Sequence, residues 1–210
     1  MRAYPDSPPQ AQPPKTYAHA VARWCIRPLI GTAVTPNHLT TLRLVTGVAA
    51  ALALAAGTRD WAIVGGTVFL VSAMLDRADG ELARLSDRSS PGGHWYDLYS
   101  DMAVNVAVFI GIGFGLVDSP LGVWAPAMGV VSGLSIGAIF LIVFQLHDQG
   151  SHPNAVFRYP KGFDFDDALF IVVPCAWFGG LLPLLIAGAI GAPAFLAFSI
   201  IKWRKGRTRP

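Results

Sequence analysis

The sequence is poor in charged residues. Of its 210 residues only 14% are Asp, Glu, Lys or Arg, whereas 53% are hydrophobic and the mean hydropathy is +0.47. A soluble domain of this length carries about 25% charged residues. The deficit indicates that lipid, rather than water, surrounds most of the chain, and it argues against an ordinary soluble domain.

Cysteine is also scarce, since Cys25 and Cys175 are the only two and lie far apart. Neither belongs to a spacing typical of a disulfide framework, a metal site or a redox site. The first fifteen residues are polar and rich in proline, without the apolar stretch of a signal peptide, and residues 1–16 are expected to be disordered. Residues 17–34 mix apolar and cationic side chains and predict an amphipathic helix at the membrane interface, which Pro28 ends or kinks.

Hydrophobic runs long enough to cross a bilayer follow one another with short connections. A spanning helix needs roughly 20 mostly apolar residues. The sequence therefore predicts an all-α integral membrane protein with six transmembrane helices in one domain over residues 35–203, followed by a basic tail at 204–210. The six expected spans are residues 39–57, 61–80, 96–117, 122–146, 167–182 and 184–203.

The distribution of basic residues predicts the orientation. Of the sixteen Lys and Arg residues, only Arg59 falls in a loop on the side opposite to the termini. The positive-inside rule then places both termini, the second-to-third loop and the fourth-to-fifth loop in the cytoplasm. We interpret the basic excess as a signal for topology and anionic lipid rather than for nucleic acid, and no nucleic-acid partner is expected.

Four aspartates stand where a membrane protein has few acids. Asp76, Asp79, Asp97 and Asp101 fall between the end of the second expected span and the first turns of the third. Ionisable residues in spans are expensive and point to function. The alternative is a solvated acidic loop, and helical geometry argues against it.

The first pair of aspartates shares a helix face with small residues. At 100° per residue, Asp79, Gly80 and Ala83 lie within an arc of about 100° that includes Asp76. Arg84 lies at the edge of that face. Glu81 lies about 140° from Asp76 and is left out of the predicted site.

The second pair, Asp97 and Asp101, is spaced by four residues and shares one face of the third span. The linker at 86–93 contains Pro91, Gly92 and Gly93 and turns the chain so that the two helices approach. Four converging carboxylates repel one another unless cations intervene. An all-oxygen cluster suits Mg²⁺ or Mn²⁺, and two such ions are a familiar arrangement for displacement at phosphorus.

These residues form a pattern that resembles the signature of the CDP-alcohol phosphotransferase family. The pattern reads Asp76-x2-Asp79-Gly80-x2-Ala83-Arg84-x8-Gly93-x3-Asp97-x3-Asp101 and agrees at all eight positions. The segment Thr35-Pro36-Asn37-His38-Leu39-Thr40-x2-Arg43 is similar to the segment that opens the family's first span. Beyond about residue 110 the similarity is one of architecture alone.

The resemblance implies a reaction and a role for each position. Members join an acceptor hydroxyl to the phosphate of a CDP-alcohol and release CMP, most often in phospholipid biosynthesis. By resemblance, Asp76, Asp79, Asp97 and Asp101 hold Mg²⁺ or Mn²⁺, with two ions per site, and Asp101 is also the general base. The expected nucleotide-binding residues are Asn37, Asp76, Gly80, Ala83, Arg84 and Gly93.

Other residues carry weaker expectations. Arg158 and Lys161 are candidates to hold a phosphate on the acceptor, or they serve only as inside-positive charges. Asp164, Asp166 and Asp167 either contact the acceptor or begin a helix favourably. A ridge formed by glycines 129, 133 and 137 predicts close helix packing, within the bundle or across a dimer. The resemblance favours a homodimer.

Two other functions fit part of the pattern. An intramembrane prenyltransferase also combines aspartates with Mg²⁺ and a diphosphate, but usually needs two separated motifs and more spans. A divalent metal-ion transporter would place its acids near the bilayer midplane in pseudo-symmetric halves. For the CDP-alcohol reaction that the resemblance implies, at least one of the donor and the acceptor is expected to be a lipid, and the pattern does not specify the acceptor alcohol.

Overall fold

The chain folds into a helical membrane bundle. The computed structural model describes residues 16–86, 90–148 and 165–207, and within these ranges all regular secondary structure is helical. Five of the described helices are long and apolar enough to cross a membrane, which makes the chain a multi-pass integral membrane protein. They are α2 (Pro36–Ala55), α3 (Arg59–Ser86), α4 (Pro91–Gly115), α5 (Trp124–Asp148) and α8 (Leu181–Arg207).

The fifth expected span, residues 167–182, has a different form. A 3-10 helix, η3 (Phe165–Ile171), leads directly into α7 (Val172–Phe178), and the apolar helical stretch Asp167–Phe178 is shorter than a standard span. Gly179, with φ +82°, ends α7 in a left-handed cap before α8 begins. The six-span architecture therefore stays a prediction.

A short helix precedes the bundle in the region where the sequence predicts an interfacial one. Helix α1 (Tyr17–Ile26) is capped by the Thr16 hydroxyl and is followed by a 3-10 turn, η2 (Arg27–Leu29), that contains Pro28. Proline lacks the N–H that would continue an α-helix, so α1 stops just before it. Ala22 and Ile26 face inward, whereas Trp24 is 72% exposed.

The boundaries of α3 and α4 differ from the sequence prediction. Helix α3 runs through the second expected span to Ser86, and its 28 residues extend about 42 Å, well beyond a hydrocarbon core of about 30 Å. Helix α4 begins at Pro91, so the expected linker residues Gly92 and Gly93 lie in its first turn. Ser90 makes this possible, because its hydroxyl caps the Gly93 N–H at 3.0 Å and proline is tolerated at the first helical position.

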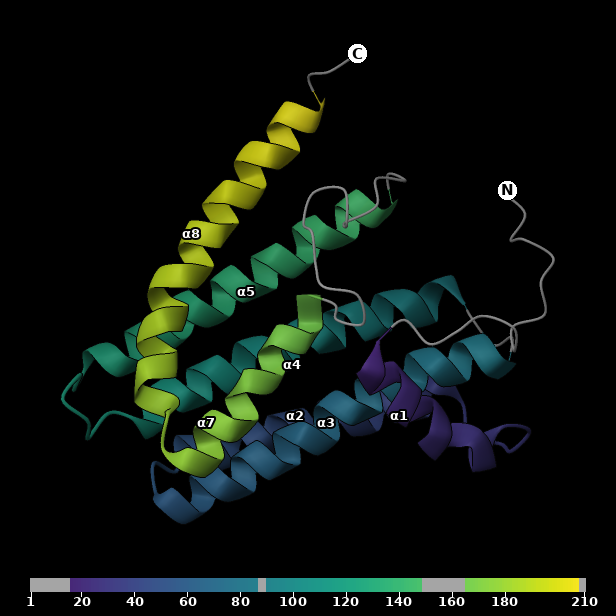
Figure 1. Cartoon of the computed structure of the whole chain (residues 1–210), viewed down its shortest axis with the longest axis horizontal. Helices are drawn as coiled ribbons and strands as arrows, with labels where there is room; N and C mark the ends of the chain where they lie inside the picture. The colour runs from purple at the N-terminus through teal and green to yellow at the C-terminus, as the bar shows by residue number, and fades with distance from the viewer. Residues whose placement is uncertain (1–15, 87–89, 149–164, 208–210) are drawn as a thin grey trace.

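Helix α4 lies at the centre of the packing, between α2 and α5 (Figure 1). A Cβ added to Gly111 would collide with the Ala51 carbonyl oxygen of α2, so the two backbones touch there. On the opposite side, Gly129 and Gly133 of α5 rest on the α4 backbone at Phe109 and Val106. The predicted glycine ridge therefore packs within the bundle, against α4.

The apolar residues divide between a buried core and a lipid-facing surface. The largest buried cluster joins α2, α3, α4, α5, α7 and α8, and includes Leu54, Phe69, Val108 and Ile112. In contrast, only 11% of the most apolar window of α8 is buried inside the protein. Exposed apolar side chains such as those on α8 are stable in lipid, where they carry no hydration penalty.

The glycine contact between α4 and α2 yields a stability prediction. Gly111→Ala should destabilise the bundle by about 1–3 kcal/mol, because the new methyl group meets a backbone oxygen that cannot move aside. The matched control is Gly191→Ala in α8, where a Cβ meets nothing within 4 Å. That change should raise stability by about 0.5–1 kcal/mol through helix propensity. Thermal unfolding in detergent measures both, and equal effects would contradict the close α2–α4 contact.

Candidate functional site

The C-terminal half of α3 and the N-terminal half of α4 lie at one end of the bundle, together with α1 and the start of α2 (Figure 1). Asp76 and Asp79 lie on the C-terminal half of α3, and Asp97 and Asp101 lie on the N-terminal half of α4. Because the two helices run in opposite directions, these halves lie at the same end, and both helices pack against α2. The helical spacing of each pair then turns both carboxylates of that pair toward the neighbouring helices.

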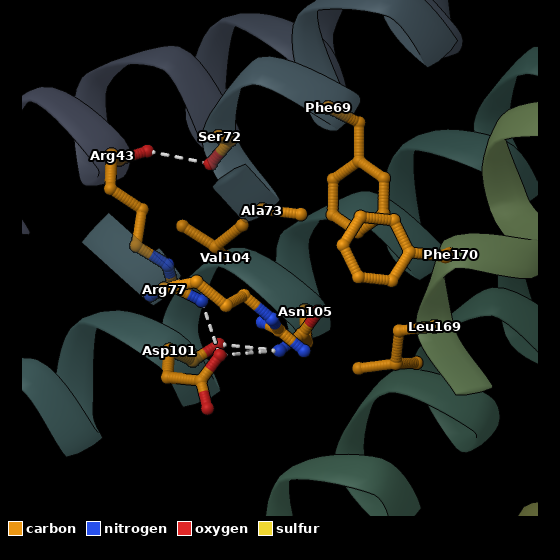
Figure 2. A pocket seen from close by; sticks show the side chains of 10 residues that line it. All are labelled: Arg43, Phe69, Ser72, Ala73, Arg77, Asp101, Val104, Asn105, Leu169 and Phe170. Carbon is orange, nitrogen blue, oxygen red and sulfur yellow. Dashed lines mark hydrogen bonds and ion pairs between the residues drawn. The ribbon is translucent and has the colours of Figure 1, made fainter. Parts of the chain in front are cut away.

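Arg43 of α2 is the central cation of the site. Its side chain is only 3% exposed, and its Nε lies 3.0 Å from Asp76 Oδ1. Its Nη2 donates to Asp101 Oδ1, on a different helix (Figure 2). One buried arginine thus joins α2, α3 and α4 through opposite charges.

A second buried arginine, Arg77, extends the network toward η3. Its Nη1 lies 2.5 Å from Asp76 Oδ2 and its Nη2 lies 3.2 Å from Asp167 Oδ1. Its guanidinium carbon also lies 5.0 Å from the centre of the Phe170 ring, within the range of a cation–π contact. Both oxygens of Asp76 are therefore paired with arginine, and any further cation there competes with these pairs.

The other three aspartates have distinct surroundings. Asp79 is 3% exposed and accepts a 2.7 Å hydrogen bond from the Thr40 hydroxyl. Asp101 accepts a 2.9 Å hydrogen bond from Asn105 Nδ2, one turn along α4. The Oδ1 atom of Asp97 is buried without a hydrogen-bond partner. A buried carboxylate oxygen lacking a donor suits a cation, and the all-oxygen donor set fits Mg²⁺ or Mn²⁺.

The carboxylates do not surround a single point in this arrangement. Among residues 16–86, 90–148 and 165–207, no three acidic, histidine or cysteine side chains form a ready cluster of metal ligands. The acids are nevertheless mutual neighbours, since Asp97 interacts electrostatically with Asp76 and Asp101, and Asp79 with Asp97. Arg43 supplies positive charge between the two helices where the four acids meet.

The predicted nucleotide-binding residues form two contact pairs. A Cβ on Gly93 would lie 3.0 Å from Asn37 Oδ1, which places the first turn of α4 against the first turn of α2. A Cβ on Gly80 would lie 3.8 Å from Arg84 Nη2, so this guanidinium lies alongside the Gly80 backbone. Ala83 is partly buried on the same helix. Gly80, Ala83 and Gly93 therefore contribute little side-chain volume to the helix faces on which they lie.

Glu81, which the helical projection leaves out of the site, is buried beside it. Its side chain is 0% exposed and lies 2.6 Å from Arg23 Nε and 3.2 Å from His19 Nδ1, both on α1. It also accepts a hydrogen bond from Arg84 Nη2. The residue faces away from the four aspartates, as the projection predicts, but it touches the arginine of the signature.

A small cavity of ≈ 10 Å³, room for about one water molecule, lies beside Asp101 (Figure 2). Arg43, Arg77 and Asn105 form its polar wall. Its apolar wall consists of Phe69, Val104, Leu169 and Phe170. The cavity thus has both Asp101 of α4 and the η3 residues Leu169 and Phe170 in its wall.

Several predicted residues are placed differently or lie outside the described ranges. Arg158, Lys161 and Asp164 lie outside the described residues, and so does the side chain of Asp166. Asp167 begins the apolar stretch that continues into α7, and its carboxylate pairs with Arg77. The sequence predicts an acceptor contact or a favourable helix start for Asp167, and the structure adds the ion pair with Arg77.

Thr40, Arg43 and Arg77 are not among the site residues predicted from the sequence. Thr40 and Arg43 are part of the quoted opening segment, three residues apart on one helix face, which was a usable signal. Arg77 and Glu81 were visible as charges inside a helix that crosses the membrane, where each needs a partner. Their partners on other helices lie 58 to 90 positions away in the chain, for example Arg23 for Glu81 and Asp167 for Arg77.

Clustered carboxylates and arginines at one end of a multi-pass helical bundle are typical of the active site of a membrane enzyme. The chain belongs to the CDP-alcohol phosphatidyltransferase family, whose model matches residues 33–199. Membership identifies it as a transferase that acts on CDP-alcohols and serves lipid synthesis. No individual curated protein matches the chain. The prenyltransferase and transporter alternatives gain no support from these findings.

The buried arginine gives a prediction that is independent of turnover. Arg43→Gln should destabilise the metal-free protein by about 3–5 kcal/mol, because Asp76 and Asp101 lose their shared partner while staying buried. Arg43→Lys keeps the positive charge and should lower the free energy of unfolding by less. Thermal unfolding in EDTA measures both changes, and a melting temperature for Arg43→Gln equal to that of the wild type would contradict the central place of this arginine.

Proposed function

We propose that the protein transfers a substituted phosphate group from a CDP-alcohol to an acceptor hydroxyl and releases CMP, in a reaction that depends on divalent metal. The observation that carries this proposal is the meeting of two carboxylate pairs from α3 and α4 around Arg43, with a buried Asp97 oxygen that lacks a donor. Family membership supports the reaction class. Phospholipid biosynthesis is the setting that such a reaction serves.

The four aspartates are the proposed ligands for one or two Mg²⁺ or Mn²⁺ ions. When bound, the metal neutralises charge that develops on the transferring phosphate and polarises the phosphorus. Asp97 offers the oxygen without a donor, whereas Asp76 is engaged by Arg43 and Arg77. Binding at Asp76 therefore competes with these ion pairs, and Arg43 compensates the carboxylate charge in the absence of metal.

The donor is proposed to lie against Gly80, Ala83 and Gly93, whose small side chains leave room for cytidine. Asn37 stands next to Gly93, and Arg84 stands next to Gly80. An amide and a guanidinium are suitable partners for the oxygens of a diphosphate, and the arginine fork binds phosphate in a fixed geometry.

Asp101 is the proposed general base. It accepts the proton of the acceptor hydroxyl, whose oxygen forms a bond to phosphorus as the bond between that phosphorus and the CMP oxygen breaks. Asn105 donates to Asp101 Oδ1 and holds the carboxylate in one orientation. CMP leaves as its anion, so direct transfer needs no covalent enzyme intermediate.

The six-span topology has support in the contacts of η3 and α7. Asp167 pairs with Arg77, near the site, whereas the Ala176 carbonyl accepts a 2.8 Å hydrogen bond from Arg59, at the first residue of α3. These two arginines are separated by about 27 Å along α3. We propose that η3 and α7 together make the fifth crossing and that the site and both termini face the cytoplasm.

The test of this function is CMP release by the purified full-length protein, with Mg²⁺ or Mn²⁺ against EDTA. CDP-diacylglycerol, CDP-choline and CDP-ethanolamine are offered in turn, each with a panel of acceptors that includes phosphorylated and unphosphorylated alcohols. Metal-dependent CMP with one pair supports the proposal and identifies the substrates. We also propose that the protein is a homodimer and that Arg158 and Lys161 hold a phosphate on the acceptor. If neither CMP release nor metal-dependent CMP binding is found, the proposal is wrong.

The role of Asp101 leads to a separate prediction. Asp101→Asn should lower kcat by about 10²–10⁴-fold, the usual contribution of a general base, and should leave CDP-alcohol binding within about threefold of the wild type. Ser100→Ala, at the neighbouring buried position on α4, serves as the control for local packing. Turnover close to that of the wild type in Asp101→Asn would exclude this residue as the base.

A further inference from the structure

Glu81 is a buried charge that the proposed mechanism does not use. Its side chain is fully buried on α3, two residues after Asp79 and three before Arg84. A carboxylate in such a place is stable only with close cationic or hydrogen-bonding partners. The identity of those partners indicates what Glu81 does.

Two of the partners come from outside the transmembrane bundle. Arg23 Nε of α1 lies 2.6 Å from Glu81 Oε2, and His19 Nδ1 of α1 lies 3.2 Å from Glu81 Oε1. Apolar contacts reinforce this docking, since Ala22 and Ile26 of α1 pack in one cluster with Leu39, Ala78 and Leu82. Helix α1 is thus fixed against α3 both by charge and by packing.

The third partner is the arginine of the signature. Arg84 Nη2 donates to Glu81 Oε1 and also lies 3.2 Å from His19 Nδ1. Both contacts use one of the three guanidinium nitrogens, so the fork retains donors for a ligand. The Arg84 side chain is 33% exposed, whereas that of Glu81 is 0% exposed.

The position of Arg84 depends on this contact. An exposed arginine samples several rotamers, and ordering its side chain costs about 2 kcal/mol. The buried carboxylate holds the guanidinium alongside Gly80, where an added Cβ would stand 3.8 Å from Nη2. The conformational entropy of the Arg84 side chain is therefore lost on folding, and ligand binding does not have to order this side chain.

We infer that Glu81 is a positioning residue that orients Arg84 for the diphosphate of the donor, and that α1, through Arg23 and His19, supplies contacts that stabilise this buried carboxylate. The inference rests on the proposed function, because it takes Arg84 as a ligand of that diphosphate. Helix α1 carries none of the signature residues, and its part is to stabilise the buried Glu81 carboxylate, whereas the orientation of Arg84 depends on Glu81 itself.

The test measures binding of CDP and of CMP to the full-length protein in detergent with Mg²⁺. In Glu81→Gln, the Kd for CDP should rise about tenfold, the loss expected when a charge-assisted hydrogen bond no longer orients the arginine. The Kd for CMP, which lacks the second phosphate, should change by about threefold at most. In turnover, the KM for the donor should rise while kcat at saturating donor stays within about twofold.

Arg23→Gln is the matched control. It breaks the 2.6 Å pair with the same carboxylate but leaves the contact between Glu81 and Arg84. It should lower the melting temperature and leave the Kd for CDP within about threefold of the wild type. If the Glu81→Gln variant does not fold, the double variant Glu81→Gln/Arg23→Gln is used in its place. The double variant removes one anion and one cation together, so no buried charge is left without its partner. Equal losses of CDP affinity in Arg23→Gln and Glu81→Gln would show a purely structural role and overturn the inference.

A double-mutant cycle with Arg84→Ala separates positioning from packing. If Glu81 acts through Arg84, Glu81→Gln has no further effect on CDP affinity once Arg84 is alanine. Additive losses would contradict the inference. A wild-type protein that binds no CDP would contradict the proposed function instead, whereas CDP binding that is equal in the wild type and Glu81→Gln would overturn only the positioning role.

Discussion

The structure depends on the pairing of charges buried among membrane helices. A charge without a partner is very unfavourable there, so each buried arginine or carboxylate requires a partner at a set distance. Arg43 meets this requirement for α3 and α4 at once, through Asp76 and Asp101. Because the three helices must keep their relative heights for these contacts to form, the same ion pairs determine the arrangement of the site.

The close packing of α4 complements this network. Lipid provides no hydrophobic force between apolar helices, so the association depends on van der Waals contact and interhelical hydrogen bonds. Glycines supply the contact: Gly111 lets α4 touch α2, and Gly129 and Gly133 let α5 touch α4. The backbone contacts hold α4 in place along its length, and the ion pair with Arg43 sets the position of Asp101.

Local patterns predicted well what lies within one helix. The spacing of Asp76 and Asp79, and of Asp97 and Asp101, placed each pair on one face, and both pairs occur on continuous helices. Boundaries were less predictable: the expected linker residues beside Pro91 begin α4, because Ser90 caps the helix there. The expected span at 167–182 begins as a 3-10 helix, which hydropathy cannot distinguish from an α-helix.

The sequence by itself determined the membrane class, the helical fold, the family and the eight positions of its signature, because these follow from composition and from spacing along single helices. Only the tertiary structure decided the partners. Arg43 lies between two aspartates, Arg77 reaches Asp167, and Glu81 pairs with Arg23 of α1. Each of these contacts links elements that are distant in the chain, and their formation depends on how the helices cross, which the periodicity of one helix does not encode.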